Sequence, residues 1–374
     1  MVEKQSKDIY SIGIACIFLS TFLSLFLGMG SFLMYDKSGN DTYIVATIGG
    51  IISLGLFYIF NYIFTKNNKE NIYKLNESLF GKKIGIILNL LLFTSFFIIS
   101  CFILYNISNF LNIEYLPEGS DKLLKALILV SLIYISSKSL PEIIRANQIF
   151  AFTSIILIII DILGLYSKFD ISNLEPILDS TRRNLLESTI LYIVLSIVPF
   201  TMLLITSKNR IKDSNKCSST IFKMVVFTNI FQIIIILITI LILGKEYIST
   251  FRFPEYTALK QFSLFNMLER VENILSLHFY FNSFSILSLL FNFMIKFLPN
   301  LSIKKYYSII ISIILFFITS LWFKDGISFT SILDKYILYV ILIGMMLPNL
   351  ITFFRLVKNN KIVQKNNKII ANDS

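Results

Sequence analysis

The sequence predicts an all-α, polytopic membrane protein whose chain crosses a bilayer about ten times. Of its 374 residues, 55% are hydrophobic and 15% are charged, whereas a soluble globular domain usually carries about 25% charged residues. The mean hydropathy is +0.73. The apolar residues recur in blocks of about 20, the length of helix that crosses roughly 30 Å of hydrocarbon. Helices satisfy their own backbone hydrogen bonds, so the lipid bilayer is the solvent that this composition fits.

Ten apolar segments follow one another, and the connections between them are too short for a soluble domain. We therefore expect a single membrane domain over residues 1–374 with short tails. The fourth segment is short, and a re-entrant or tilted arrangement stays open for it. The first runs to about Tyr35 without a small-residue cleavage site, so we interpret it as a retained helix and not a signal peptide. The segments lie at about 10–34, 43–64, 84–110, 123–137, 147–166, 188–206, 221–243, 271–294, 306–323 and 336–357.

Lysine and arginine gather in alternate connections, and this predicts the orientation of the chain. With the N-terminus inside, the inner loops and tails, including Lys4 and Lys7, hold 22 of the 34 basic residues. Acidic residues such as Glu114, Glu118 and Asp121 lie in the outer loops. By the positive-inside rule we expect both termini to be cytoplasmic. The net charge of +11 does not indicate nucleic-acid binding, because no loop is long enough to form a basic folded domain.

The residues that build metal sites and enzyme active sites are scarce. Cys16, Cys101 and Cys217 have no paired spacing, so we expect neither a disulfide nor a metal site from them. His278 is the single histidine, which excludes a histidine-built metal cluster. There is no phosphate-binding loop, glycine-flanked nucleophilic serine or His/Glu metal helix. We therefore expect no enzyme activity and no cofactor.

The first segment contains Gly28-Met29-Gly30, followed by Ser31. Two glycines weaken a helix and permit it to unwind, which frees backbone groups to bind a ligand. Close helix packing through small residues is the alternative interpretation.

The sixth segment contains Ser196-Ile197-Val198-Pro199, followed by Phe200 and Thr201. Proline removes one hydrogen bond within a helix and leaves a carbonyl free in the preceding turn, although a simple kink is the alternative. In transporters built from two inverted five-helix repeats, the first and sixth helices hold corresponding positions and are interrupted. Ten segments with helix-weakening residues in the first and sixth fit that pattern, with repeats at about 10–166 and 188–357.

Polar residues inside other segments supply further candidates. His278, Asn282 and Ser285 follow i, i+4, i+7 spacing and share one helical face, which should face the bundle interior or a water-filled cavity. A single hydrogen bond from His278 to a neighbouring helix is the alternative. Asp161 is the one acidic residue well surrounded by apolar sequence, so it is either a proton or ion site or an interfacial residue near the outer end of its helix.

Four amides and phenols form a weaker set of candidates within the apolar segments. They either contact a ligand or hydrogen-bond between helices. Of these, Tyr105 lies in the third segment and is retained as a ligand-binding candidate. The set is Tyr105, Asn106, Asn229 and Gln232.

Five short motifs are spread in order over most of the chain. They are Gly39–Ile44 (Gly-Asn-Asp-Thr-Tyr-Ile), Leu116–Ser120, Pro141–Arg145, Asp170–Pro176, and Phe253-Pro254 followed by Glu269-Arg270-Val271-Glu272. Together they resemble the B-subunit family of spore germination receptors, within the amino acid, polyamine and organocation transporter superfamily. Tyr43 where that family has tryptophan, and Ser120 where it has proline, mark a divergent member.

The resemblance implies the ten-helix inverted-repeat fold and a ligand pocket between broken helices one and six, bordered by helices three and eight. It implies a small nutrient as ligand, typically an amino acid, and two partners: a membrane subunit with a large soluble domain and a lipoprotein subunit. The implied location is the spore inner membrane. The matching pocket positions are Gly28, Met29, Gly30, Ser31, Ser196, Pro199, Phe200 and Thr201.

Three functions follow as hypotheses. The first is a receptor subunit that binds a nutrient and signals to its partners, which the germination motifs favour. The second is a secondary transporter of amino acids driven by a proton or Na⁺ gradient, in which Asp161 would be the proton site. The third is a passive water or ion pore, for which the polar face of His278, Asn282 and Ser285 is the motivation.

Overall fold

The computed structural model describes residues 8–261, 271–298 and 304–372, and most of them lie in helices. Seven apolar helical stretches in these residues are long enough to cross a membrane. The first, Ser11–Lys66, contains two passages separated by a turn, and two shorter helices, at Asp121–Ser136 and Lys304–Trp322, bring the passages to ten. The prediction of an all-α polytopic protein is confirmed. Lys4, Lys7, Glu269 and Arg270, which the sequence analysis used, lie outside the described residues.

The ten passages match the ten predicted apolar segments in order. The first half consists of α1 (Ser11–Leu25), η1 (Phe26–Gly30) and α2 (Ser31–Ser38), then η2 (Gly39–Asp41), α3 (Thr42–Lys66), α4 (Ile72–Glu114), α5 (Asp121–Ser136) and α6 (Leu140–Leu165). The connection between the two halves contains η3 (Tyr166–Lys168) and η4 (Ile171–Leu174). The second half consists of α7 (Arg182–Met202), η5 (Leu203–Ile205), η6 (Lys208–Arg210), α8 (Ser214–Ile248), α9 (Pro254–Leu259), α10 (Val271–Leu275), α11 (Leu277–Phe297), α12 (Lys304–Trp322), α13 (Gly326–Ile341), η8 (Leu342–Met346) and α14 (Leu347–Asn372).

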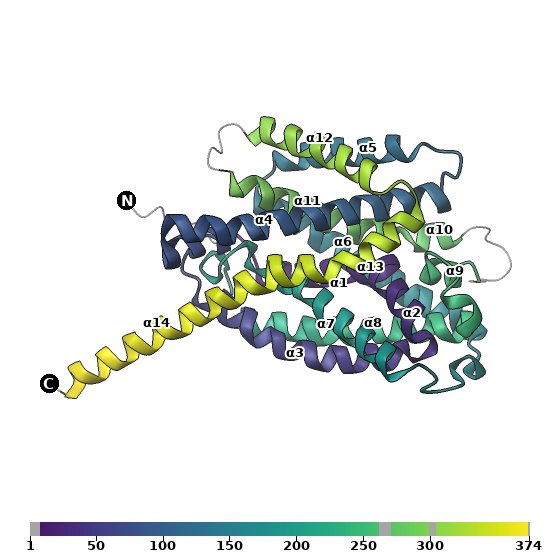
Figure 1. Ribbon diagram of the computed structural model, residues 1–374, viewed down its shortest axis with the longest axis horizontal. Coiled ribbons are helices and arrows are strands. Elements are labelled where there is room, and N and C mark those ends of the chain that lie inside the picture. The colour runs from purple at the N-terminus through teal and green to yellow at the C-terminus, as the bar shows by residue number, and fades with distance from the viewer. Residues whose placement is uncertain (1–7, 262–270, 299–303, 373–374) are drawn as a thin grey trace.

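Helices of the two halves pair reciprocally. The first helix of the first half packs on the second helix of the second half (α1 with α8), and the reverse pair, α3 with α7, is also in contact. The third and fifth helices pair in the same crossed way, α6 with α11 and α4 with α13 and α14, and the fourth helices, α5 and α12, lie side by side (Figure 1). Crossed pairs of this kind are what two repeats related by a two-fold axis produce. The exact bounds of the repeats stay a prediction.

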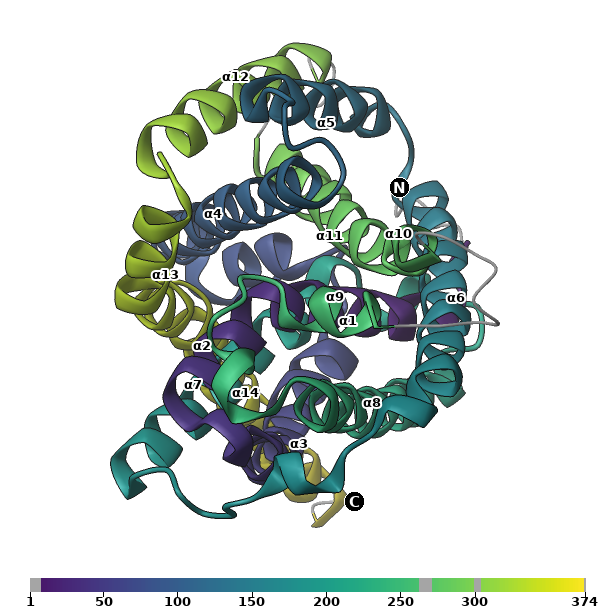
Figure 2. The same cartoon turned by 90° about the vertical axis from the view of Figure 1, so that its right-hand side faces the viewer.

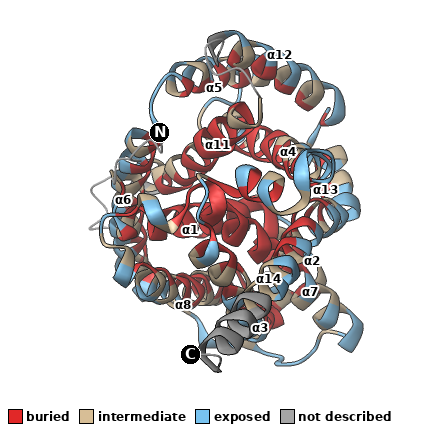
Figure 3. Ribbon diagram, turned by 90° about the vertical axis from the view of Figure 1, so that its left-hand side faces the viewer, coloured by how far each residue is buried: buried red, intermediate tan, exposed pale blue. Residues whose placement is uncertain are grey.

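Helix α1 lies at the centre of the bundle. It contacts α6, α7, α8 and α11, and Figure 2 shows the other helices arranged around it. Every residue from Gly13 to Leu25 is buried. The helix carries no charged residue and is apolar on all sides, as expected of a helix without a solvent or lipid face. Burial decreases from this centre to the periphery, where exposed and intermediate residues predominate (Figure 3).

The turn after the first passage is tied to the connection between the two halves. The carboxylate of Asp41 accepts hydrogen bonds from the backbone N–H groups of Leu178 (2.7 Å) and Ser180 (2.9 Å). The Asn40 side-chain amide donates to the Glu175 carbonyl at 3.3 Å. Two of the five sequence motifs therefore meet in space. Their polar residues hold the connection between the two halves in place.

Candidate functional site

The central helix is interrupted between α1 and α2. Leu27 (φ −66°, ψ 120°) and Gly28 (φ 69°, ψ 0°) leave the helical conformation. A positive φ is accessible to glycine and strained for residues with a side chain. A Cβ at Gly28 would also lie 2.7 Å from Cδ1 of Phe253. The unwinding predicted from the two glycines is therefore located at Gly28.

Gly30 and Ser31 stabilise the interruption from its far side. A Cβ built on Gly30 would lie 2.7 Å from Cδ1 of Leu195 on α7, so close packing, the alternative interpretation of the glycine pair, holds at this second glycine. The Ser31 hydroxyl donates to the Phe26 carbonyl at 2.7 Å. Met29 is buried against α7 and its neighbours. Unwinding and close packing therefore occur two residues apart, at Gly28 and Gly30.

Helix six is not interrupted at its proline, and the expectation of a second broken helix is wrong. Helix α7 continues through Pro199 to Met202, with no non-helical residue inside it. The Ser196 hydroxyl donates to the Tyr192 carbonyl at 2.9 Å, and the Thr201 hydroxyl donates to the Ile197 carbonyl at 2.8 Å. The Phe200 ring packs on Phe18, with centroids 5.0 Å apart. Side-chain hydrogen bonds and packing keep the helix intact, so these residues form part of the core and do not frame an opening.

Asp161 and His278 meet in the interior. Asp161 on α6 and His278 on α11 are 5% and 7% exposed, and Oδ2 of Asp161 lies 3.7 Å from Nδ1 of His278. Asp161 is therefore buried between helices, and its Oδ1 has no hydrogen-bond partner among the described residues. The Asn282 side-chain amide donates to the His278 carbonyl within the same helix at 2.8 Å.

Tyr105 belongs to a different group of residues. Its ring stacks on Phe329 with centroids 4.6 Å apart, and the Lys125 ammonium lies 5.0 Å from its ring centroid. Lys125 is 1% exposed and forms a 2.5 Å ion pair with Asp121. Tyr105 therefore packs toward α5 and α13, and the Phe329 ring beside it also lies against the guanidinium of Arg252, which precedes α9.

Sequence reasoning missed the segment that covers the interruption. Helix α9 contacts η1 and lies over α1 in Figure 2. The Phe253 ring packs against Phe110, with centroids 5.1 Å apart. Glu255, in the first turn of α9, lines two small cavities at the interruption. Phe253-Pro254 belongs to one of the five motifs, but with Glu255 it looks like the start of an ordinary loop helix, and nothing in it indicates that it reaches the centre of the bundle.

Two oppositely charged side chains flank Phe253. Burial raises the pKa of the Glu255 carboxyl to about 7, and its interactions with Ser31 and the Gly28 backbone oppose the rise. Burial lowers the pKa of the Arg252 guanidinium to about 10. Arg252 Nη2 donates to Oδ1 of Asn106 at 3.0 Å, and the guanidinium lies over the rings of Phe32, Phe253 and Phe329.

The space at the interruption is small. One cavity of about 40 Å³ is lined by Leu27, Asp161, Glu255 and His278, among others. A second, of about 20 Å³, lies among Gly28, the aromatic rings and Glu255. Each holds at most a few atoms, since one water needs roughly 10–15 Å³ of such volume. With α9 in this position, an entire amino acid does not fit.

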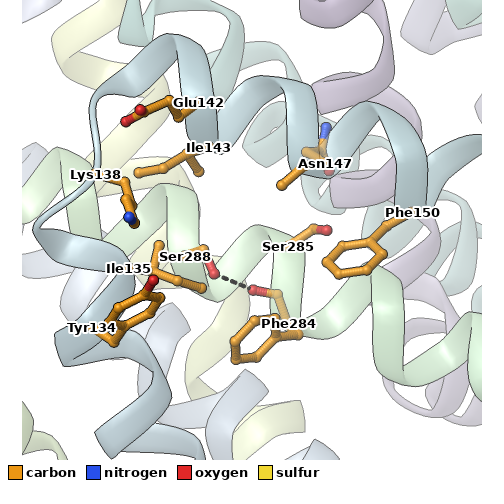
Figure 4. Close-up of a pocket in the computed structure, with 11 residues that line it drawn as sticks. Tyr134, Ile135, Lys138, Glu142, Ile143, Asn147, Phe150, Phe284, Ser285 and Ser288 are labelled. Carbon is orange, nitrogen blue, oxygen red and sulfur yellow. Dashed lines mark hydrogen bonds between the residues drawn. The ribbon is translucent and has the colours of Figure 1, made fainter.

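A larger cavity, of about 380 Å³, lies between α5, α6 and α11 (Figure 4). Asn147 and Ser285, which are 2% and 3% exposed, lie on its α6 and α11 walls. Both polar side-chain atoms of Asn147 and the Ser285 hydroxyl are buried without a hydrogen-bond partner in the described part of the chain. Lys138 and Glu142 lie at one end and Phe150 at the other (Figure 4). Ser285 thus faces this cavity, one turn from Asn282.

Comparison with known proteins gives a family and a fold. A model of the family described as "Spore germination protein" matches residues 11–358. The structure is similar to that of Mhp1, a nucleobase-cation-symport-1 family transporter, in a closed conformation with bromovinylhydantoin bound. That likeness has a TM-score of 0.60 at 10% identity and covers 89% of this chain and 78% of Mhp1. It is a likeness of fold, and it confirms the transporter-like architecture. No curated protein matches the sequence.

Proposed function

Because the chain belongs to the spore germination protein family, we propose that this multi-pass membrane protein is the subunit of a germinant receptor that binds the nutrient. The nutrient is a small molecule, an amino acid in this proposal, and binding at the interruption of helix α1 triggers germination. The observation that carries the proposal is the positive φ of Gly28, which interrupts the most buried helix of the bundle. The family is one of membrane germination proteins and not of enzymes.

The interruption supplies the chemistry that a small polar ligand needs. Non-helical backbone at membrane depth is tolerated where it lines a cavity or is buried in protein. Leu27 and Gly28 meet that condition, because the two small cavities lie beside them. The N-terminal end of α2 presents N–H groups with a partial positive charge, and the carbonyls that end α1 present acceptors. A ligand bound there would contact both halves of the helix.

Ligand binding at this position requires α9 to move, and the movement is the signal in our proposal. Phe253 and Glu255 fill the space beside Gly28, so this conformation is closed. A nutrient that binds better when α9 is displaced shifts the population toward the displaced state. Partner subunits, a membrane subunit with a large soluble domain and a lipoprotein, would detect that state. The inner membrane of the spore is the proposed location, with both termini in the cytoplasm.

A gradient-driven transporter is the second candidate, and the Asp161–His278 pair favours it. A buried carboxylate beside an imidazole inside the membrane is an arrangement that proton-coupled carriers use. That function predicts uptake of the nutrient into vesicles that depends on a proton or Na⁺ gradient. The receptor function predicts binding without such uptake.

Binding of amino acids to the full chain in nanodiscs tests the proposal. Each of the twenty proteinogenic amino acids is screened by its effect on the melting temperature. A ligand that binds the folded protein and not the unfolded chain raises this temperature. We expect at least one to stabilise the wild-type chain and to lose its effect in Gly30→Leu, because the new side chain would overlap Leu195.

Gly55→Leu is the matched control, since a side chain there meets open space, and it should keep the response. An unchanged response in Gly30→Leu would contradict a site at the interruption. No response to any amino acid, from the protein alone and together with its partner subunits, would contradict the receptor function.

A further inference from the structure

Glu255 places a carboxylate in the centre of the bundle. It lines the cavity that contains Asp161 and His278 and also the cavity enclosed by aromatic rings, so it lies between the two. Its Oε1 is buried and accepts no hydrogen bond within the described residues. A buried acceptor of this kind is costly unless a partner supplies protons to it. The site therefore lacks a donor at this position.

Arg252 does not supply that donor. Its guanidinium points at Asn106 and the rings of Phe32, Phe253 and Phe329, and none of the ion pairs among the described residues joins it to Glu255. The Arg252 Nε and Nη1 atoms are themselves buried, and no acceptor in residues 8–261, 271–298 or 304–372 hydrogen-bonds to them. The two charges nevertheless act on each other electrostatically. The segment thus carries an anion and a cation, each of which has buried atoms that lack a hydrogen-bond partner among the described residues.

The surroundings of Glu255 suit an ammonium group. Phe110 lies at the centre of a cluster, with ring centroids 4.5 Å from Phe279, 5.1 Å from Phe253 and 5.4 Å from Tyr256. Aromatic rings attract cations through their faces, and the attraction grows when water is excluded. The adjoining cavities, of about 20 and 40 Å³, accommodate a group of the size of an ammonium.

Glu255 also determines which charged group of a ligand can bind at the N-terminal end of α2. The N-terminal end of α2 attracts negative charge, and Glu255 already interacts there with Gly28 and Ser31. A ligand carboxylate would be repelled at that position. The unsatisfied Nε–H and Nη1–H of Arg252 offer the alternative, because a guanidinium matches the geometry of a carboxylate with two parallel hydrogen bonds.

We propose that Arg252 and Glu255 recognise the zwitterion of an α-amino acid, with the guanidinium binding its carboxylate and the Glu255 carboxylate binding its ammonium. The inference rests on the proposed function in that it assigns the residues that recognise the ligand at the same site. Each charged group of the ligand then provides hydrogen-bond partners for the buried atoms of one of the two side chains. Molecules with only one of these charges leave the other unsatisfied, and the site discriminates against them.

The test measures the affinity of the full chain in nanodiscs by calorimetry. The probe is the amino acid that gives the largest thermal stabilisation in the wild-type protein, together with its amide, which lacks the carboxylate, and its N-acetyl derivative, which lacks the ammonium. We expect both derivatives to bind the wild-type chain at least about thirtyfold more weakly, as loss of one partner of a buried charge pair usually costs.

Glu255→Gln and Arg252→Gln are the decisive variants. We expect each to bind the amino acid at least about thirtyfold more weakly. Arg252→Gln should in addition lose its preference for the amino acid over the amide, and Glu255→Gln its preference over the N-acetyl derivative. Lys245→Gln, which removes a charge that is paired with Asp179 on the surface, is the control and should bind like the wild type. Melting curves without ligand establish that each variant is folded.

The pH dependence provides a second readout. With a pKa of about 7, Glu255 is mostly protonated at pH 6 and mostly ionised at pH 8, so the affinity should rise between these values. Arg252 and Tyr256 on the same segment, Tyr35 on α2, Asp161 on α6 and His278 on α11 are the other titratable groups that face it. The rise must therefore disappear in Glu255→Gln to be assigned to Glu255.

The outcomes separate the inference from the proposed function. Wild-type binding that survives in both Gln variants, or equal affinity for the amino acid and its two derivatives, overturns the zwitterion site and leaves the receptor function standing. Absence of binding by every amino acid in the wild-type chain with its partners overturns both. Weakened binding in both variants with the matching loss of discrimination supports the inference.

Discussion

Helices α1 and α7 occupy corresponding positions in the two halves of the bundle, and both carry residues that weaken a helix. Only α1 is interrupted. Gly28 adopts a conformation that other residues avoid, and Phe253 and Glu255 from a distant segment occupy the space beside it. At Pro199, one backbone hydrogen bond is missing. The Ser196 and Thr201 hydroxyls donate to carbonyls of the preceding turn, and aromatic rings pack on Phe200, so the helix stays continuous. A glycine thus opens a helix where another segment can occupy the opening, and a proline in a packed core does not.

The largest difference between the two helices is expected from Gly28→Val and Pro199→Ala. Valine at position 28 combines an unfavourable φ with an overlap of its Cβ and the Phe253 ring. We expect it to cost about 3 kcal/mol or more in stability and to abolish nutrient binding. Pro199→Ala restores an N–H donor and should change stability by about 1 kcal/mol or less, with binding intact. Melting temperature and nutrient affinity in nanodiscs measure both, and equal effects of the two variants would refute the comparison.

Two phenylalanines provide the next test. Phe253 and Phe200 are both buried, and truncating either to alanine should cost about 3 kcal/mol. The two truncations should nevertheless differ in their effect on the rate of nutrient association. Phe253→Ala removes the ring beside Gly28 and should speed nutrient association, whereas Phe200→Ala should leave the association rate unchanged. Stopped-flow binding distinguishes them, and an effect of Phe200→Ala on association equal to that of Phe253→Ala would be the contrary result.

Asp161→Asn sharpens the choice between receptor and transporter. The substitution keeps the shape of the side chain and removes the charge that faces His278. If the protein is a receptor, nutrient affinity should fall by less than about tenfold, that is 1.4 kcal/mol. Uptake of the labelled nutrient into proteoliposomes with an imposed proton gradient should be absent in both wild type and variant. Gradient-dependent uptake by the wild type that Asp161→Asn abolishes would establish the transporter instead.

The smallest expected effects come from two hydroxyls. Ser31→Ala removes the donor to the Phe26 carbonyl, and Thr201→Val removes the donor to the Ile197 carbonyl. Each should reduce stability by about 1 kcal/mol. Only Ser31 lies at the interruption, so only Ser31→Ala should also weaken nutrient binding. Thr201→Val is its matched control, and weakened binding in both would place Thr201 in the site after all.

Much of the fold could be predicted because the bilayer imposes simple rules on sequence. All ten passages coincide with apolar blocks, and the absence of charge from the first block is consistent with its central position. The Gly28-Met29-Gly30 triplet located the interruption because a positive φ has a clear residue preference. The burial of Asp161 was one of two alternatives, since sequence does not tell which side of a helix faces lipid.

The rest depends on contacts between residues far apart in the chain. Arg252 and Glu255 lie in a polar connection, where charged residues usually face water, and nothing local indicates that α9 packs against η1. Tyr105 stays a predicted ligand-binding residue; its neighbours are Lys125 and Phe329, and Arg252 packs on the same Phe329 ring. The interruption expected at Pro199 was inferred from inverted-repeat transporters, in which the first and sixth helices are both interrupted. Whether a proline breaks a helix is decided by the packing around it, which a single sequence does not contain.

A structure of the receptor with its nutrient bound tests the central claim most directly. The account predicts ligand density beside Gly28, between Arg252 and Glu255, with α9 displaced from the position described above. Density instead in the cavity of about 380 Å³ lined by Asn147, Phe150 and Ser285, with α9 still packed on Gly28, would contradict it.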